Sequence, residues 1–87
     1  MLTVTDKALE LLAGVVDRTQ ASEGAAVRIV ARPERWGIEM DQMQPGDETF
    51  EHDDRTVLIL DAHVSESLQD MTLDVDNTPE GLKLRLR

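Results

Sequence analysis

Two short segments place histidine beside carboxylates, and these side chains are the usual protein ligands of zinc and iron. The first segment is Glu51-His52-Asp53-Asp54 and the second is Asp61-Ala62-His63. A metal site needs three or four such ligands converging on one point. Neither segment has the i, i+4 spacing that gathers ligands on one helix face, so each also fits a solvated turn or an ordinary first helical turn. A metal site built from His52, His63 and Asp61 is therefore the alternative hypothesis for function.

Four further residues are candidates for binding a small anion or a protein partner. The alternation of Val27, Ile29 and Ala31 with Arg28, Val30 and Arg32 predicts a strand. The even spacing of Arg28 and Arg32 predicts that they share one face of it, and Arg35 and Trp36 follow in the loop 33–37. Arginine can hold an anionic group by paired hydrogen bonds. The simpler interpretation is that these arginines pair with neighbouring acids.

A second basic segment, Lys83, Arg85 and Arg87, occupies the outward face of the last expected strand. Together with Arg28, Arg32 and Arg35 it contains six of the nine bases of the chain. If the two strands are neighbours, they form a local basic face. The simpler interpretation is again cross-strand pairing, here with Asp74 and Asp76.

Trp36 is the only tryptophan and stands in a polar segment, Pro33-Glu34-Arg35-Trp36-Gly37. Tryptophan is enriched at interaction hot spots. It is also a common cover for the edge of a small core. Both interpretations remain open at this stage.

Residue types found in hydrolase triads occur together around Asp61, His63, Ser65 and Ser67. The sequence contains no nucleophile elbow, no glycine-rich oxyanion segment and no phosphate-binding glycine loop. A chain of 87 residues also leaves little room for a catalytic cleft. We therefore expect no enzyme and no resident cofactor.

The composition also excludes some classes of partner and of site. The net charge is −9, from 18 acids and 9 bases, and only two residues, Trp36 and Phe50, are aromatic. Acidic chains repel phosphate backbones, and two aromatics are too few for a base-stacking surface, so we expect no nucleic-acid binding. There is no cysteine, which excludes disulfides, thiolate nucleophiles and thiolate–metal sites within these residues.

The length of 87 residues predicts one domain, residues 1–87. The N-terminus lacks a basic region followed by an apolar run, and the longest apolar run, Val57–Leu60, is far too short to span a bilayer. We expect a cytoplasmic protein with no membrane partner.

Helical spacing of Ala8, Leu11, Leu12, Val15 and Val16 predicts an N-terminal helix capped by Thr5 and ending in the polar stretch 20–24. Strands are predicted at 27–32, at 38–41, at Thr49–His52 along an edge, and at Val57–Leu60 in a buried centre. Gln44-Pro45-Gly46-Asp47 fits a type II turn. Asp61 can cap a short helix over 62–69.

The last part of the chain predicts a hairpin. Met71, Leu73 and Val75 alternate with polar residues, as do Leu82, Leu84 and Leu86. A four-residue loop at 77–80 would place Val75 opposite Leu82 and Leu73 opposite Leu84. The same register sets Asp74 opposite Lys83.

Taken in order, these elements resemble the HesB/IscA family, the A-type carriers of iron–sulfur cluster assembly. The resemblance covers Leu2 to Leu86, and its most specific part is Val57–Leu84: a buried strand ending in Asp61, a short helix and the strand Leu73-Asp74-Val75. It implies an α+β fold, with an N-terminal helix, a small and mostly antiparallel sheet or sandwich, and one further short helix. It also implies a possible homodimer.

Family members hold iron or a cluster through three cysteines. The resemblance places the first at Arg35 or Trp36, just before Gly37, and the other two in a tail beyond Arg87. No ligand position carries over, and clusters require thiolates. The sequence therefore predicts a HesB/IscA-like domain that is a binding or accessory module rather than a cluster carrier.

Overall fold

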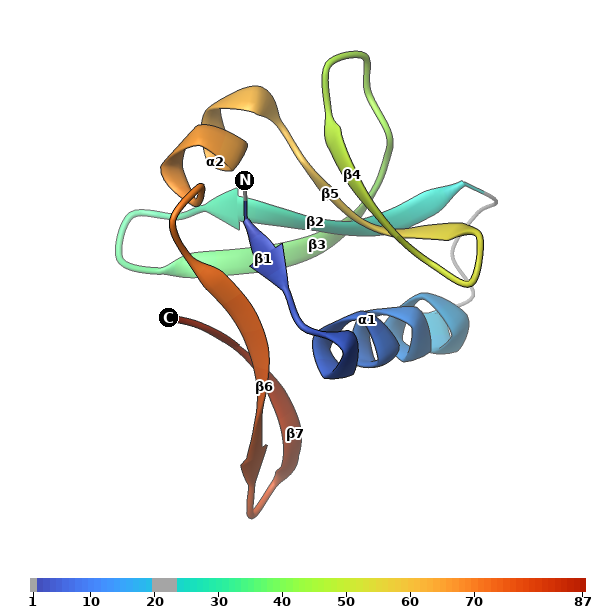
Figure 1. Ribbon diagram of the computed structural model, residues 1–87, viewed down its shortest axis with the longest axis vertical. Coiled ribbons are helices and arrows are strands. Elements are labelled where there is room, and N and C mark those ends of the chain that lie inside the picture. Colours follow the sequence, from blue (N-terminus) through green and yellow to red (C-terminus); the bar gives the residue numbers. More distant parts are fainter. Residues whose placement is uncertain (1, 20–23) are drawn as a thin grey trace.

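The computed structural model describes residues 2–19 and 24–87 and arranges them in seven strands and two helices (Figure 1). The elements in chain order are β1 (Thr3–Val4), α1 (Asp6–Thr19), β2 (Ala25–Ala31), β3 (Trp36–Gln42), β4 (Glu48–His52), β5 (Arg55–Leu60), α2 (Ala62–Ser67), β6 (Thr72–Thr78) and β7 (Gly81–Leu86). Neither described helix has the length and apolar character needed to cross a membrane.

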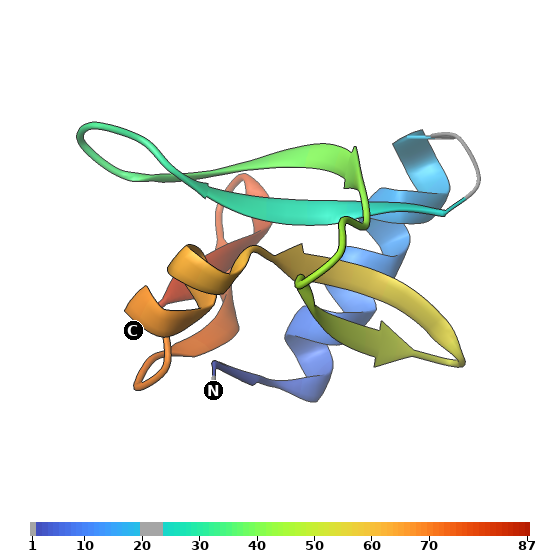
Figure 2. The same cartoon turned by 90° about the horizontal axis from the view of Figure 1, so that it is seen from above.

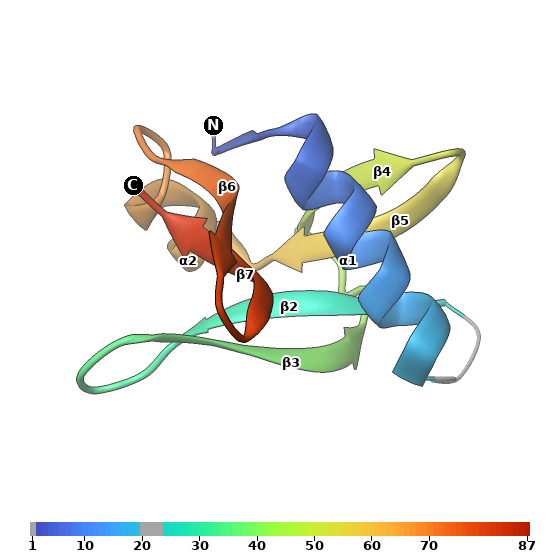
Figure 3. The ribbon, with the colours of Figure 1, turned by 90° about the horizontal axis from the view of Figure 1, so that it is seen from below.

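The strands form two sheets. The larger has the order β3-β2-β5-β4 and the smaller the order β1-β6-β7. The pairs β2–β3, β4–β5 and β6–β7 are antiparallel, whereas β2–β5 and β1–β6 are parallel. Figures 2 and 3 show that α1 and the β6–β7 hairpin lie on the same face of the larger sheet. The predicted α+β class, with one long helix and one short helix, is confirmed.

The core gathers around β5, the central strand that the apolar run predicted. Val57, Leu58, Ile59 and Leu60 are fully buried, as expected for a strand covered on both faces. Leu12 from α1 and Leu73 from β6 belong to the same core. The helix packs onto β5 and β2, and the smaller sheet contacts α1 through β6 and β7. The predicted edge position of the strand at Thr49–His52 is also confirmed, because β4 ends the sheet.

Thr5 caps α1 as predicted: its Oγ1 accepts a hydrogen bond of 3.2 Å from the Ala8 N–H. The sequence did not predict the short strand before it. Thr3 and Val4 form β1, which pairs in parallel with Thr72 and Leu73. A strand of two residues is too short to show the alternation of apolar and polar side chains. It is therefore recognised only from its pairing with β6. The predicted helix end in 20–24 lies largely outside the described residues.

The predicted loop 33–37 is too long by two residues. Trp36 and Gly37 already belong to β3 and pair with Ala31 and Val30. The turn is closed earlier, because the Arg32 N–H donates to the Arg35 carbonyl oxygen at 3.0 Å. The helix predicted over 62–69 is likewise shorter, with Leu68 leaving helical geometry as the C-cap of α2. Its N-cap is Asp61 as predicted, 2.8 Å from the Val64 nitrogen.

The C-terminal hairpin has a two-residue loop, so the predicted register is wrong by two positions. Val75 lies opposite Leu84 rather than Leu82, and Asp76 lies opposite Lys83. Thr78 and Gly81 form the last pair, and Gly81 takes a φ of +117°, which glycine adopts readily. A shift of two residues leaves every side chain on its predicted face, so apolar alternation alone does not distinguish the two registers.

Candidate functional site

Arg28 is buried and already occupied by acids. Its Nε lies 2.9 Å from Asp41 Oδ2, and its two terminal nitrogens lie 3.2 and 2.7 Å from the two carboxylate oxygens of Asp47. One of them also donates to the Gln42 carbonyl oxygen at 3.2 Å. Only 7% of the residue is exposed. Arg28 therefore joins β2 to β3 and to the turn that follows, and it does not contribute to an open binding surface.

The turn that supplies Asp47 has the predicted geometry. The Asp47 N–H donates to the Gln44 carbonyl oxygen at 3.1 Å, and Gly46 takes a φ of +89°. The Arg28 guanidinium, helped by the Gln44 N–H, lowers the pKa of the Asp47 carboxyl below its ordinary value. Asp47 is therefore held in its ionised form as part of the fold.

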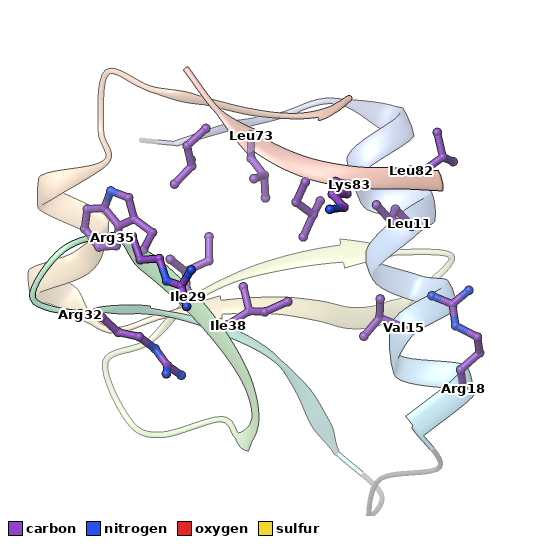
Figure 4. Close-up of a pocket in the computed structure, with 14 residues that line it drawn as sticks. Leu11, Val15, Arg18, Ile29, Arg32, Arg35, Ile38, Leu73, Leu82 and Lys83 are labelled. Atoms are coloured by element: carbon purple, nitrogen blue, oxygen red, sulfur yellow. The ribbon is translucent and has the colours of Figure 1, made fainter. Parts of the chain in front are cut away.

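The other three candidates, Arg32, Arg35 and Trp36, line a pocket of about 720 Å³ between the two sheets and α1 (Figure 4). Its apolar lining comes from α1, from β2 and β3, and from the hairpin β6–β7. These side chains include Leu11, Val15, Ile29, Ile38, Leu73 and Leu84. The pocket thus lies between the larger sheet on one side and α1 with the smaller sheet on the other.

Every charged residue among those lining this pocket is a base. They are Arg18 from α1, Arg32 and Arg35 from the β2–β3 turn, and Lys83 from β7. In Figure 4, Arg32 and Arg35 lie at one end and Arg18 at the other, with Ile29 and Ile38 between them. Four of the nine bases of an acidic chain therefore gather around one apolar hollow.

The β2–β3 turn places Arg32 and Trp36 on opposite faces of the larger sheet. Trp36 pairs with Ala31 and so shares the face of Ile29, whereas Gly37 pairs with Val30 on the face of Arg28. A Cβ at position 37 would overlap the middle of the Arg32 side chain, so Arg32 lies on the same face as Arg28, as the even spacing predicted. The two arginines still form no open binding surface together, because Arg28 is buried against Asp41 and Asp47.

Lys83 and Arg87, two of the bases near the C-terminus, have different surroundings. Lys83 lines the pocket and also pairs with Glu80 at 3.1 Å. Arg87 pairs with Asp74 at 2.9 Å, as the simpler interpretation predicted. Asp74 in turn accepts bonds from the Val75 N–H and from Thr5 Oγ1, which lower the pKa of its carboxyl. β7 is not a neighbour of β2 in a sheet; the two basic segments approach each other only across the pocket.

The residues of the alternative metal hypothesis lie on separate elements. His52 ends β4 beside Asp53, at 3.5 Å, whereas His63 is exposed on α2. Asp61 serves as the cap of α2. Within residues 2–19 and 24–87, no group of three or more His, Asp or Glu side chains is placed to hold a metal ion.

Sequence reasoning missed Arg18, Ile38 and Leu82 as pocket residues. One signal for Arg18 was present: Leu11, Val15 and Arg18 follow one another at helical spacing, so they share a face of α1. The sequence identifies Ile38 and Leu82 only as strand residues. Their position at the pocket depends on how the two sheets pack, which no local sequence pattern predicts.

No model of a protein family matches the sequence, and neither does any functionally curated protein. Solved structures do match. A protein from Aquifex aeolicus is 24% identical with a TM-score of 0.69, over 99% of this chain and 89% of that one.

Two further structures concern iron–sulfur clusters. Escherichia coli SufA, involved in the biosynthesis of iron–sulfur clusters, is 19% identical with a TM-score of 0.73, over 99% of this chain and 83% of its own. IscA with the [2Fe-2S] cluster is 18% identical with a TM-score of 0.62, over 100% of this chain and 81% of its own. The chain therefore has a HesB/IscA-like fold.

Proposed function

We propose that this protein is a non-catalytic binding or accessory module that uses a HesB/IscA-like fold without carrying an iron–sulfur cluster. It binds a protein partner or a small anion through the surface around Arg32, Arg35 and Trp36. The observation that supports this most strongly is the pocket itself. Where the family resemblance places a cysteine, at Arg35 or Trp36, the chain has a basic, apolar-lined hollow.

The ligand chemistry supports the same proposal. Iron–sulfur clusters are anionic assemblies held by thiolates, and the chain has no cysteine. Guanidinium groups donate hydrogen bonds and cannot coordinate iron, but they suit carboxylates and phosphates. Among the structural neighbours, SufA is involved in the biosynthesis of iron–sulfur clusters and IscA holds a [2Fe-2S] cluster, so a role beside cluster biosynthesis is part of the proposal.

Reconstitution tests the proposal. The purified protein is incubated with ferrous iron and sulfide under anaerobic, reducing conditions, desalted, and analysed for iron, acid-labile sulfide and visible absorption. IscA, whose solved structure contains a [2Fe-2S] cluster, serves as the positive control. We expect IscA to become coloured and this protein to remain colourless. A stoichiometric chromophore on this protein would reject the proposal.

A further inference from the structure

The exposed apolar side chains of this protein are concentrated at the pocket. Four large apolar residues are exposed among those described: Trp36 at 36%, Ile38 at 49%, Met43 at 58% and Leu82 at 57%. Three of them, all except Met43, line the pocket. Scattered apolar residues on a surface need no explanation, but a cluster around one hollow indicates a binding site.

The size of the hollow fits a small molecule. Pockets of about 300–1,000 Å³ with mostly apolar linings and a few polar groups are typical of small-ligand sites. This pocket, at about 720 Å³, lies within that range. In Figure 4, Ile29 and Ile38 lie between Arg35 at one end and Arg18 at the other.

The charges around the pocket select an anion. No acidic residue is among those that line it, although the chain has 18 acids and 9 bases. Among the described residues, neither Arg32 nor Arg35 forms an ion pair or a side-chain hydrogen bond, whereas Arg28, Arg55 and Arg87 are each paired with an acid. The guanidinium group of Arg35 is therefore available to a ligand at one end of the apolar hollow, and that of Arg32, which has no described partner either, lies on the other face of β2 and β3.

We infer that this pocket binds an amphiphilic anion: an apolar chain that ends in a carboxylate or phosphate. The inference rests on the proposed binding function and names its ligand class. The head group accepts hydrogen bonds from Arg35, and its apolar chain lies along Ile29 and Ile38 toward α1. Trp36 lies at the head-group end and senses occupancy.

Trp36 also supplies the measurement, because it is the only tryptophan and the chain has no tyrosine. Its emission is followed during titration with octanoate and octyl phosphate below their micellar concentrations. Octan-1-ol has the same alkyl chain without a charge, octyltrimethylammonium has it with the opposite charge, and acetate has the negative charge without a long alkyl chain. We expect saturable emission changes with the two amphiphilic anions, much weaker binding of octanol and acetate, and none of the cation.

Variants assign the binding to this pocket. Loss of a charged hydrogen-bond donor should weaken octanoate binding about tenfold in Arg35→Gln. The matched control is Arg85→Gln, which removes the same charge from β7 at an exposed position outside the pocket lining. We expect the control to bind like the unmodified protein. Isothermal calorimetry with the same probes measures binding independently of Trp36.

Four outcomes overturn the inference. They are no binding of either anion by calorimetry, equal affinity for octyltrimethylammonium, equal effects of Arg35→Gln and Arg85→Gln, or sedimentation showing that a second copy of the chain occupies the pocket and excludes octanoate. If octyl phosphate binds and octanoate does not, the head group is a phosphate; the reverse assigns a carboxylate. If the protein assembles no cluster and binds neither anion, only the inferred ligand class is rejected. If it assembles a cluster, the proposed function itself is rejected.

Discussion

The guanidinium of Arg28 binds both carboxylate oxygens of Asp47, with nitrogen–oxygen distances of 3.2 and 2.7 Å. The contact joins the middle of β2 to the turn before β4, and both side chains are more than nine-tenths buried. A base and an acid that are nineteen positions apart in the sequence thus form one structural unit. This explains why Arg28 takes no part in the pocket while Arg32 and Arg35 do.

Removing Arg28 should destabilise the fold without affecting the pocket. In Arg28→Gln the buried Asp47 carboxylate loses its partner, which lowers the free energy of unfolding by about 2–3 kcal/mol. Urea denaturation measures this loss. The control is Arg55→Gln, because Arg55 pairs with Asp17 at the surface, where water and salt screen the interaction. Equal losses in the two variants would contradict a structural role for Arg28.

Lowering the pH should reduce the stability of the fold because the Asp47 carboxylate becomes protonated. Because the folded state lowers the pKa of this carboxyl from its ordinary 3.8, the unfolded chain binds the proton more readily. The stabilisation is present above the ordinary value and is lost as the pH falls through the lowered one. Denaturation midpoints measured across this range should fall less steeply in Asp47→Asn than in the unmodified protein. Parallel profiles would show that the Arg28–Asp47 contact is not formed in solution.

Gly37→Ala should displace Arg32 and leave the apolar part of the pocket intact. The new Cβ meets the Arg32 side chain, which has no described ion pair to hold it, on the face of β3 opposite Ile38. Position 37 has an ordinary strand conformation, so we expect a small change in thermal stability and unchanged octanoate binding. The measurements are the melting temperature and the Trp36 titration. Weaker octanoate binding would mean that Arg32 contacts the ligand.

Gly14→Ala should stabilise the protein. Gly14 lies inside α1, and nothing stands within 4 Å of where its Cβ would be. Alanine reduces the entropy lost on folding and raises the free energy of unfolding by about 0.5–1 kcal/mol. Chemical denaturation checks the gain, and the variant should bind octanoate unchanged. A loss of stability would indicate that the helix packs more closely at this position than the structure shows.

Much of the fold was predictable because its signals are local. The cap at Thr5, the buried run Val57–Leu60 and the turn at Gln44–Asp47 each depend on a few consecutive residues. The hairpin register was not predictable in the same way. Its two possible loops differ by two residues and leave the apolar faces unchanged, and the hydrogen bond from Thr78 Oγ1 to the Gly81 carbonyl oxygen, at 2.7 Å, forms only in the tighter one.

The candidate site was predictable in part. Arg32, Arg35 and Trp36 were identified from residue type and proximity, and all three line the pocket. Arg28 was assigned to the same surface because strand spacing does not report which charges find buried partners. Arg18 and Leu82 come from elements that are distant in sequence from β3, and only the folded arrangement of α1, β7 and β3 around the pocket brings them together.

Native mass spectrometry of the protein purified anaerobically from cells is the most direct test. It weighs the intact chain with whatever it holds, so a cluster and an organic ligand are distinguished in one spectrum. We expect the mass of the chain alone together with a population carrying an organic anion, and the latter should be reduced in Arg35→Gln. Mass increments of iron and sulfide on most of the molecules would show instead that this cysteine-free chain carries a cluster.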